Sequence, residues 1–253
     1  MKITADFHTH TRYSHGTGTV NDNAVNALSL GLRAVAITDH ARNHPIVGVK
    51  KSKLDAIRQD INAVDKEYRN IKVLMGLEAN IISKKGDIDV SEEDAEKLDL
   101  LLLGFHLTAY QKSLADYFAL PFNGVTRIFF KNSAKQKAVN TQAVIDSVLR
   151  NKIDILTHPG FRIDVDYYAV AEACREAGTF MELSSRHRTP DISGLEQALK
   201  AGAKFIVNSD AHKPVNVGRC AYALDLIGEL GLTDNEVVNI SDKPITFRRG
   251  LTV

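Results

Sequence analysis

Seven short apolar runs, spaced along the whole chain, constrain the fold more than any other feature of the sequence. Most stay apolar for four or more residues, as in AVAI from residue 34 and LLLLGF from residue 100. Such runs are typical of strands buried on both faces of a parallel sheet. We expect strands at Ile3–Phe7, Ala34–Thr38, Val73–Leu77, Leu98–Phe105, Ile153–Thr157, Thr179–Leu183 and Lys204–Asn208.

Helical patterns separate these runs. In the clearest one, Leu54, Ile57, Ile61, Val64 and Tyr68 recur at spacings of three and four and would form one apolar stripe. Strands that alternate with helices predict an α/β fold with a parallel sheet. The chain has 253 residues, of which 44% are apolar and 25% charged. This length suits a single domain over residues 1–253, a TIM-like barrel with one strand fewer than the usual eight.

Local signals mark several helix ends. The stretches Ser91–Asp94 (SEED) and Thr233–Glu236 (TDNE) match helix starts. Gly178 and Gly202 follow helical patterns and predict C-terminal helix ends. Residues 107–135 break the rhythm and predict an insertion after the fourth strand. Its role is open between a packed surface loop or subunit contact and a lid over a site.

Residue types that bind metals follow the predicted strands. Six of the seven strands end in His, Asp or Glu, and the carboxyl ends of barrel strands converge on the face that carries active sites. The spacing of His8 and His10 sends both side chains to one side of an extended strand, with Asp6 and Thr9 pointing the other way. The candidate ligands are His8, His10, His15, His40, Glu78, His106, His158, Asp210 and His212.

A single histidine after a strand is more often a polar residue in a wet loop than a ligand. Here seven of the chain's nine histidines gather at one end of the predicted fold. Imidazoles buried together without a ligand leave unpaired polar groups and repel one another when protonated. Divalent metal ions remove both costs, since neutral imidazole and carboxylate are natural donors. Nine donors suit two or three ions, with a carboxylate such as Glu78 as the bridge.

The composition argues against several classes of protein. A net charge of +1 creates no field that would attract nucleic acid or a membrane surface. The first residues show no secretion signal, and no run of 18 apolar residues predicts a membrane span. Cys174 and Cys220 lie far apart and fit a reducing compartment. We therefore expect a cytoplasmic protein without membrane or nucleic-acid partners; the sequence does not fix its oligomeric state.

The motifs resemble the PHP (polymerase and histidinol phosphatase) family. They are DFHTHTRYSHG, AITDHA, GLEANI, LLLGFH, ILTHPG, MELSS and NSDAH, in this order from Ile3 to about His212. The details are most similar to the stand-alone bacterial phosphohydrolases of this family. The resemblance implies a distorted (β/α)7 barrel with three divalent metal ions. Zinc is the expected metal, with manganese or iron as alternatives.

Carried over by motif, the resemblance also implies how the metals divide the donors. The first metal would bind His8, His10, Glu78 and Asp210. The second would bind Glu78, His106 and His158, and the third His15, His40 and His212. This sequence fills all nine positions.

Such a site favours phosphate ester hydrolysis. Clustered divalent ions lower the pKa of a bridging water and neutralise a bound anion. A phosphate monoester, with a charge near −2, suits them better than a neutral amide or ester. The phosphoesterase activity known for the family agrees. We expect a metal-dependent phosphatase that attacks a small phosphate monoester with a metal-bridging hydroxide, as in histidinol phosphatases.

Basic residues that follow the strands are candidates for substrate binding. The triplet Arg186–Arg188 is the strongest, because no metal ligand is predicted at the end of the sixth strand. Arginine can contact phosphate at two points, and His187 could give a proton to the leaving group. We predict catalytic roles for Glu78, Asp210, Arg186 and His187. The other basic candidates are Arg12, Arg42, Arg162, Arg188 and Lys213.

Three alternatives stay open. A metal-dependent nuclease or phosphodiesterase of the TatD-like type uses a similar barrel but lacks equivalents of His15, His40 and His212. An amidohydrolase-type enzyme usually bridges its metals with a carboxylated lysine, and no lysine ends a predicted strand. A regulatory role without catalysis is opposed by the complete set of ligands.

Overall fold

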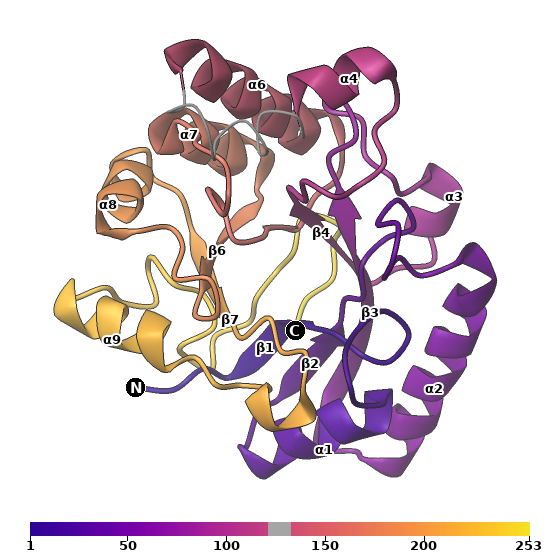
Figure 1. The fold of residues 1–253 in the computed structure, drawn as a ribbon. Coiled ribbons are helices and arrows are strands. Elements are labelled where there is room, and N and C mark those ends of the chain that lie inside the picture. The colour runs from indigo at the N-terminus through magenta and orange to yellow at the C-terminus, as the bar shows by residue number, and fades with distance from the viewer. Residues whose placement is uncertain (121–132) are drawn as a thin grey trace.

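The computed structural model describes residues 1–120 and 133–253. Seven parallel strands, in sequence order, form one sheet that curls into a nearly closed barrel with helices around it (Figure 1). This confirms the predicted α/β barrel. The strands are β1 Ala5–Thr9, β2 Ala34–Ile37, β3 Lys72–Asn80, β4 Leu100–Gly104, β5 Ile155–Leu156, β6 Phe180–Ser184 and β7 Phe205–Asn208.

The helices cover the outside of the sheet. On α2, four residues of the predicted stripe, Leu54, Ile57, Ile61 and Val64, are buried, whereas the fifth, Tyr68, follows the last residue of the helix and is half-buried. The helices are α1 Val20–Ser29, α2 Leu54–Glu67, α3 Glu92–Ala95, α4 Leu114–Ala119, α6 Ala134–Arg150, α7 Tyr167–Ala177, α8 Ile192–Lys200 and α9 Ala221–Glu229, with short 3-10 turns η1 Lys51–Lys53 and η2 Pro214–Asn216.

Most of the predicted helix ends are present. Ser91 caps α3 by accepting a hydrogen bond from Asp94 N, and Gly178 and Gly202 follow α7 and α8 with φ of 73° and 79°. The helix start predicted at Thr233–Glu236 is wrong. The first turn forms, but Phe205 N then donates to Glu236 O at 2.7 Å, and Val237 makes a single parallel bridge to β7 in place of a second helical turn.

The segment after α9 closes the barrel between β7 and β1. The side-chain amide of Asn239 donates to Ala5 O at 2.9 Å and to Val207 O at 2.7 Å, and its Oδ1 accepts from Val207 N at 2.9 Å. Between the carboxyl ends of the same two strands, His10 N donates to Ala211 O at 2.8 Å. One buried asparagine therefore satisfies backbone groups that an eighth strand would otherwise pair with.

Apolar side chains fill the half of the barrel where the strands begin. The chain end closes this half, since the Phe247 ring meets Phe7 edge to face at 5.0 Å between centroids and lies 5.7 Å from the Phe180 ring. The other members of this buried cluster are Ala5, Ala34, Ala36, Leu74, Leu100, Leu102, Ile155, Ile206 and Ile245. The opposite half is left for polar groups.

The core joins the two described stretches of the chain. A second buried cluster, between the sheet and the helices, runs from Ile3 to Val237, and we infer a single domain over residues 1–253. In the expected insertion at about 107–135, α4 is present and α6 begins at Ala134, whereas residues 121–132 lie outside the described residues. In the part that is described, every helix is too short or too polar to cross a bilayer.

Candidate metal centre

A β-bulge in β1 directs the first two predicted ligands. The pairing of β1 with β2 shifts register between Asp6 and Thr9, because β1 carries an extra residue there. Bulges of this kind re-aim side chains. Phe7 and His8, neighbours in sequence, can therefore both face the interior. His10 follows His8 on the same side, while Asp6 and Thr9 make their hydrogen bonds outside it.

Glu78 of β3 lies fully buried at the centre of the polar half of the barrel. Its Oε1 is 2.8 Å from His158 Nε2 and 3.4 Å from His106 Nε2. Its Oε2 is 2.9 Å from His40 Nδ1 and 3.5 Å from His8 Nε2. Four of the predicted ligands, each from a different strand end, therefore surround one carboxylate.

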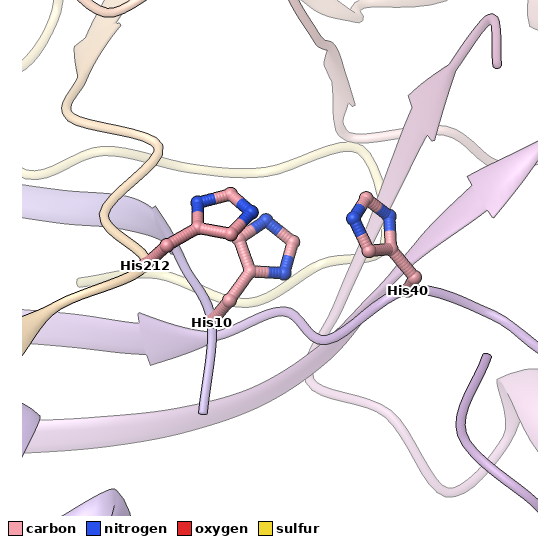
Figure 2. A group of neighbouring side chains, drawn as sticks. All are labelled: His10, His40 and His212. Carbon is pink, nitrogen blue, oxygen red and sulfur yellow. The ribbon is translucent and has the colours of Figure 1, made fainter. Parts of the chain in front are cut away.

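Histidines from three separate segments, His10, His40 and His212, turn their rings toward one another (Figure 2). His10 and His40 each bring a nitrogen within 3.7 Å of Glu78 Oε2. The ring centroid of His10 is 4.5 Å from that of His40 and 4.3 Å from that of His212. His15, from the loop after β1, lies next to them with its centroid 4.1 Å from His212. Rings this close form one cluster.

Asp210, just after β7, faces two groups of donors with its two oxygens. Its Oδ1 is 3.1 Å from His10 Nε2 and 3.6 Å from His8 Nε2. Its Oδ2 is 2.9 Å from His187 Nε2 and 3.3 Å from Arg186 Nη1. The backbone of Asp210 has a φ of 49°. This left-handed conformation is uncommon outside glycine, and such strain often marks a functional position.

Two buried partners orient the imidazoles, and the sequence patterns do not single out either. Glu182 of β6 accepts from His8 Nδ1 at 2.8 Å and from His158 N at 2.7 Å. Asn80 of β3 accepts from His106 Nδ1 at 2.7 Å. The sequence predicts no ligand at the end of β6, and in the structure Glu182 of this strand orients two of the predicted ligands, His8 and His158. The sequence feature that could have identified Glu182 is an acidic residue, in MELSS, within a strand predicted to be buried.

The donor set fits divalent cations. His10 Nδ1, His40 Nδ1 and Glu78 Oε2 are buried without a hydrogen-bond partner; the latter two are close but not in hydrogen-bond geometry. Unpaired buried polar atoms are costly, and a cation among them would satisfy them. Four sets of donors lie within 4.8 Å of one another: His8, His10 and Asp210; His10, His40 and His212; His40, Glu78 and His106; His158, His187 and Asp210. These sets overlap, and the division among three metals stays a prediction.

The charge states of Glu78, His15 and His212 suit metal binding. Burial would raise the pKa of Glu78, but His106, His8 and His40 together hold that pKa well below its usual value. Burial, with His212 and His40 nearby, lowers the pKa of His15 to about 4. Burial also lowers the pKa of His212 to about 4. Both imidazoles are therefore neutral near pH 7, the form that binds metals.

The cluster opens into a cavity of about 250 Å³. Apolar side chains form part of its wall, together with Leu107 and Thr108 from the start of the predicted insertion. The size suits a small ligand better than a folded macromolecule. The lining residues are His15, His40, His44, Ile46, Val47, Glu78, Phe105, His106, Leu107, Thr108, His158, Phe161, Arg162, Arg186, His187, Asp210 and His212.

Of the basic candidates, the structure places Arg186, His187 and Arg162 at this cavity. The Arg162 guanidinium lies over the Phe161 ring at 4.9 Å. Arg42 instead pairs with Asp94, and Arg188 lies over the Tyr222 ring at 5.3 Å. Lys213 lines a neighbouring recess, and Arg12 is exposed outside the cavity lining.

Gly104, at the end of β4, leaves the space in which Glu78 and His106 meet. A Cβ atom there would lie 2.6 Å from His106 Cε1 and 2.7 Å from Glu78 Oε1. We expect Gly104→Ala to lower kcat at least about tenfold, because small displacements of catalytic groups are costly. Gly228→Ala is the matched control, since nothing lies within 4 Å of a Cβ at that position of α9. Equal activity of the two variants in a phosphatase assay would show that Glu78 and His106 tolerate displacement.

Comparisons with known proteins decide the family. A family model described as the PHP domain matches residues 6–184, more than half of the chain. The chain belongs to the PHP family. This PHP protein is 28% identical over 249 residues to a probable phosphatase from Thermoanaerobacter sp. (strain X514), covering 94% of this chain and 91% of that protein. A probable phosphatase from Shewanella sp. (strain ANA-3) is 27% identical and covers 95% and 89%. The predicted enzyme class agrees with both.

Solved structures share the fold of this PHP protein. The histidinol phosphate phosphatase of Lactococcus lactis, solved with zinc, L-histidinol and phosphate, superposes with a TM-score of 0.62 at 15% identity, covering 91% of this chain and 94% of that one. A chain from the metal-dependent tyrosine phosphatases of Bacillus subtilis and Streptococcus pneumoniae gives 0.54 at 18% identity, covering 98% and 99%. At sequence identities this low, the superpositions show a common barrel fold and nothing about substrate.

Proposed function

We propose that this protein hydrolyses a small phosphate monoester, in the manner of a histidinol phosphatase, at a site that binds three divalent ions. Zinc is the expected metal, with manganese or iron as alternatives. The observation that carries the proposal is the buried Glu78 carboxylate, with nitrogens of His8, His40, His106 and His158 at 2.8 to 3.5 Å. The names of relatives that match nearly the whole chain support it.

Divalent ions bound there would lower the pKa of a water and offset the charge of the phosphoryl group. The chain's own residues hold the donors in place. Thr157 Oγ1 donates to Glu78 Oε1 at 2.9 Å, and Asn80 and Glu182 fix the rings of His106 and His8. Hydrogen bonds of this kind set ring orientation and tautomer before substrate binds.

Arg186 and His187 are the proposed substrate-facing residues. Arg186 Nη1 is 3.0 Å from His212 Nε2 at the cavity edge, and 43% of its side chain is exposed, so it can turn toward a phosphate. The His187 ring packs on Phe161 with centroids 3.8 Å apart. This packing holds the imidazole at the cavity wall, where it could protonate the departing alkoxide.

The two residues should give different kinetic signatures. Arg186→Lys should lower kcat/KM about tenfold for all esters, because lysine cannot reproduce a two-point contact. His187→Ala should slow alkyl phosphates about a hundredfold and spare p-nitrophenyl phosphate, whose leaving group needs no proton. Arg12→Lys serves as the exposed control. A loss with His187→Ala that is equal for both ester types would mean that His187 only positions Asp210 or contributes to metal binding.

A panel of substrates tests the function itself. Purified protein should hydrolyse p-nitrophenyl phosphate, lose this activity with a chelator, and regain it with zinc or manganese. Activity confined to bis(p-nitrophenyl) phosphate or to single-stranded DNA would replace the phosphatase proposal by the nuclease alternative.

A further inference from the structure

A recess of about 320 Å³ adjoins the candidate metal centre. It shares Arg186, Asp210 and His212 with the cavity described above, so the two spaces have a common wall. Lys213, Asn216 and Arg219 line the rest of it, together with two serines. Three cationic side chains therefore face one small space directly beside the metal centre.

Two of the three cations of the recess, Lys213 and Arg219, are not neutralised within the described part of the chain, whereas Arg186 pairs with Asp210 at 3.3 Å. Lys213 and Arg219 form no ion pair with any residue that the structure describes, whereas Arg42 pairs with Asp94 and Arg58 with Asp99. The one carboxylate that lines the recess is Asp210. Its oxygens already lie against His10, His187 and Arg186, and none pairs with Lys213 or Arg219 in the described part of the chain. The recess thus keeps an excess of positive charge, which attracts anions.

The wall that carries Lys213 and Arg219 is built from a rigid turn. Asn216 N donates to Lys213 O at 2.9 Å, and Arg219 N donates to Asn216 O at 3.0 Å, so η2 places both cations on one loop. Pro214 packs against Gly18 so closely that a Cβ there would lie 2.2 Å from Pro214 Cγ. A preformed wall lowers the entropy cost of binding.

We propose that this recess binds a second anionic group, a phosphate or carboxylate, of the same substrate whose reacting phosphate lies at the metal centre. Arg186 lies in the common wall and would contact the substrate between its two anions. The proposal rests on the proposed phosphatase function and narrows its substrate class to small doubly anionic molecules. Phosphate and carboxylate share the chemistry that arginine and lysine recognise.

A matched series of esters tests this proposal. The substrates are alkanediol monophosphates of about three to eight carbons, and the same chains with a second phosphate or a carboxylate at the far end. For the best chain length, we expect kcat/KM of the parent protein to be about tenfold higher with the second anion. This preference should fall as salt rises, because the contacts are partly exposed.

Variants locate the preference. Arg219→Gln and Lys213→Gln should each reduce it, and the double variant should abolish it, while Arg219→Lys should retain part of it. Arg69→Gln, an exposed arginine before β3 at the other end of the barrel, is the control and should keep the preference. The comparison of phosphate-ended with carboxylate-ended chains identifies the anion that the recess prefers.

The outcomes of this series distinguish failure of the recess proposal from failure of the phosphatase function. Hydrolysis of p-nitrophenyl phosphate with no preference at any chain length would leave the phosphatase function intact and overturn the recess proposal. A preference that survives the double variant would also overturn it. Inhibition by inorganic phosphate that the double variant relieves, without any substrate preference, would show an adventitious ion only. Failure of the parent protein on every monoester would refute the phosphatase function and this proposal with it.

Discussion

Glu78→Gln is expected to lower kcat by about a hundredfold or more. Glutamine keeps the shape of the side chain but loses the negative charge, and its amide nitrogen is a poor partner for the imidazole nitrogens around it. Glu78 is fully buried and lies within 3.5 Å of nitrogens of four histidines. Removing one key electrostatic group from an active site typically costs a factor of this size.

The measurement is kcat at saturating p-nitrophenyl phosphate, with metal content determined on the same sample. Glu93→Gln is the matched control, because Glu93 is a 69% exposed carboxylate that pairs with Lys51 on the surface. A Glu78→Gln protein with near-parent kcat and unchanged metal content would show that Glu78 is peripheral to catalysis.

Glu182→Gln is expected to weaken metal binding or lower kcat about ten- to hundredfold, the usual cost of losing a partner that orients a ligand. Glu182 accepts from His8 Nδ1, His158 N and Asn208 Nδ2 at 2.7 to 3.0 Å. Glutamine offers one acceptor oxygen, so its NH2 group would face a donor. Burial lowers the pKa of His8, but Glu182, Glu78 and Asp210 outweigh it and raise this pKa well above its usual value.

The metal affinity of this variant is measured by competition with a chromogenic chelator. A lower affinity would show that Glu182 orients His8 for metal binding, and a lower kcat at unchanged affinity would show an effect on the reaction alone. A thermal melt of the metal-loaded variant tests whether it is folded. Parent-like affinity and parent-like kcat together would contradict the assigned role of Glu182.

The strands and the candidate donors could be predicted because both depend on local sequence. Apolar runs such as AVAI and LLLLGF predict all seven strands, and the donors in or just after the last residues of these strands meet at one end of the barrel. The grouping of donors could not be read in the same way. His40, for example, lies near Glu78 and also near His10 and His212, and such distances depend on how the sheet curls.

Features that depend on distant contacts were missed for physical reasons. The Thr233–Glu236 stretch carries a good capping signal, yet pairing with Phe205 overrides it. Asn239 helps to close the barrel by donating to Ala5 O, a backbone group 234 residues away in sequence. Arg42, a predicted candidate for phosphate binding, pairs with Asp94 of α3, a contact between residues 52 positions apart in sequence.

Metal content tests the central claim most directly. The protein should be stripped with a chelator, reconstituted with zinc or manganese, freed of excess ion and analysed for metal per chain. A site with three divalent ions predicts more than two equivalents, falling in the Glu78→Gln variant. One equivalent or fewer in the reconstituted parent protein would contradict the trinuclear site.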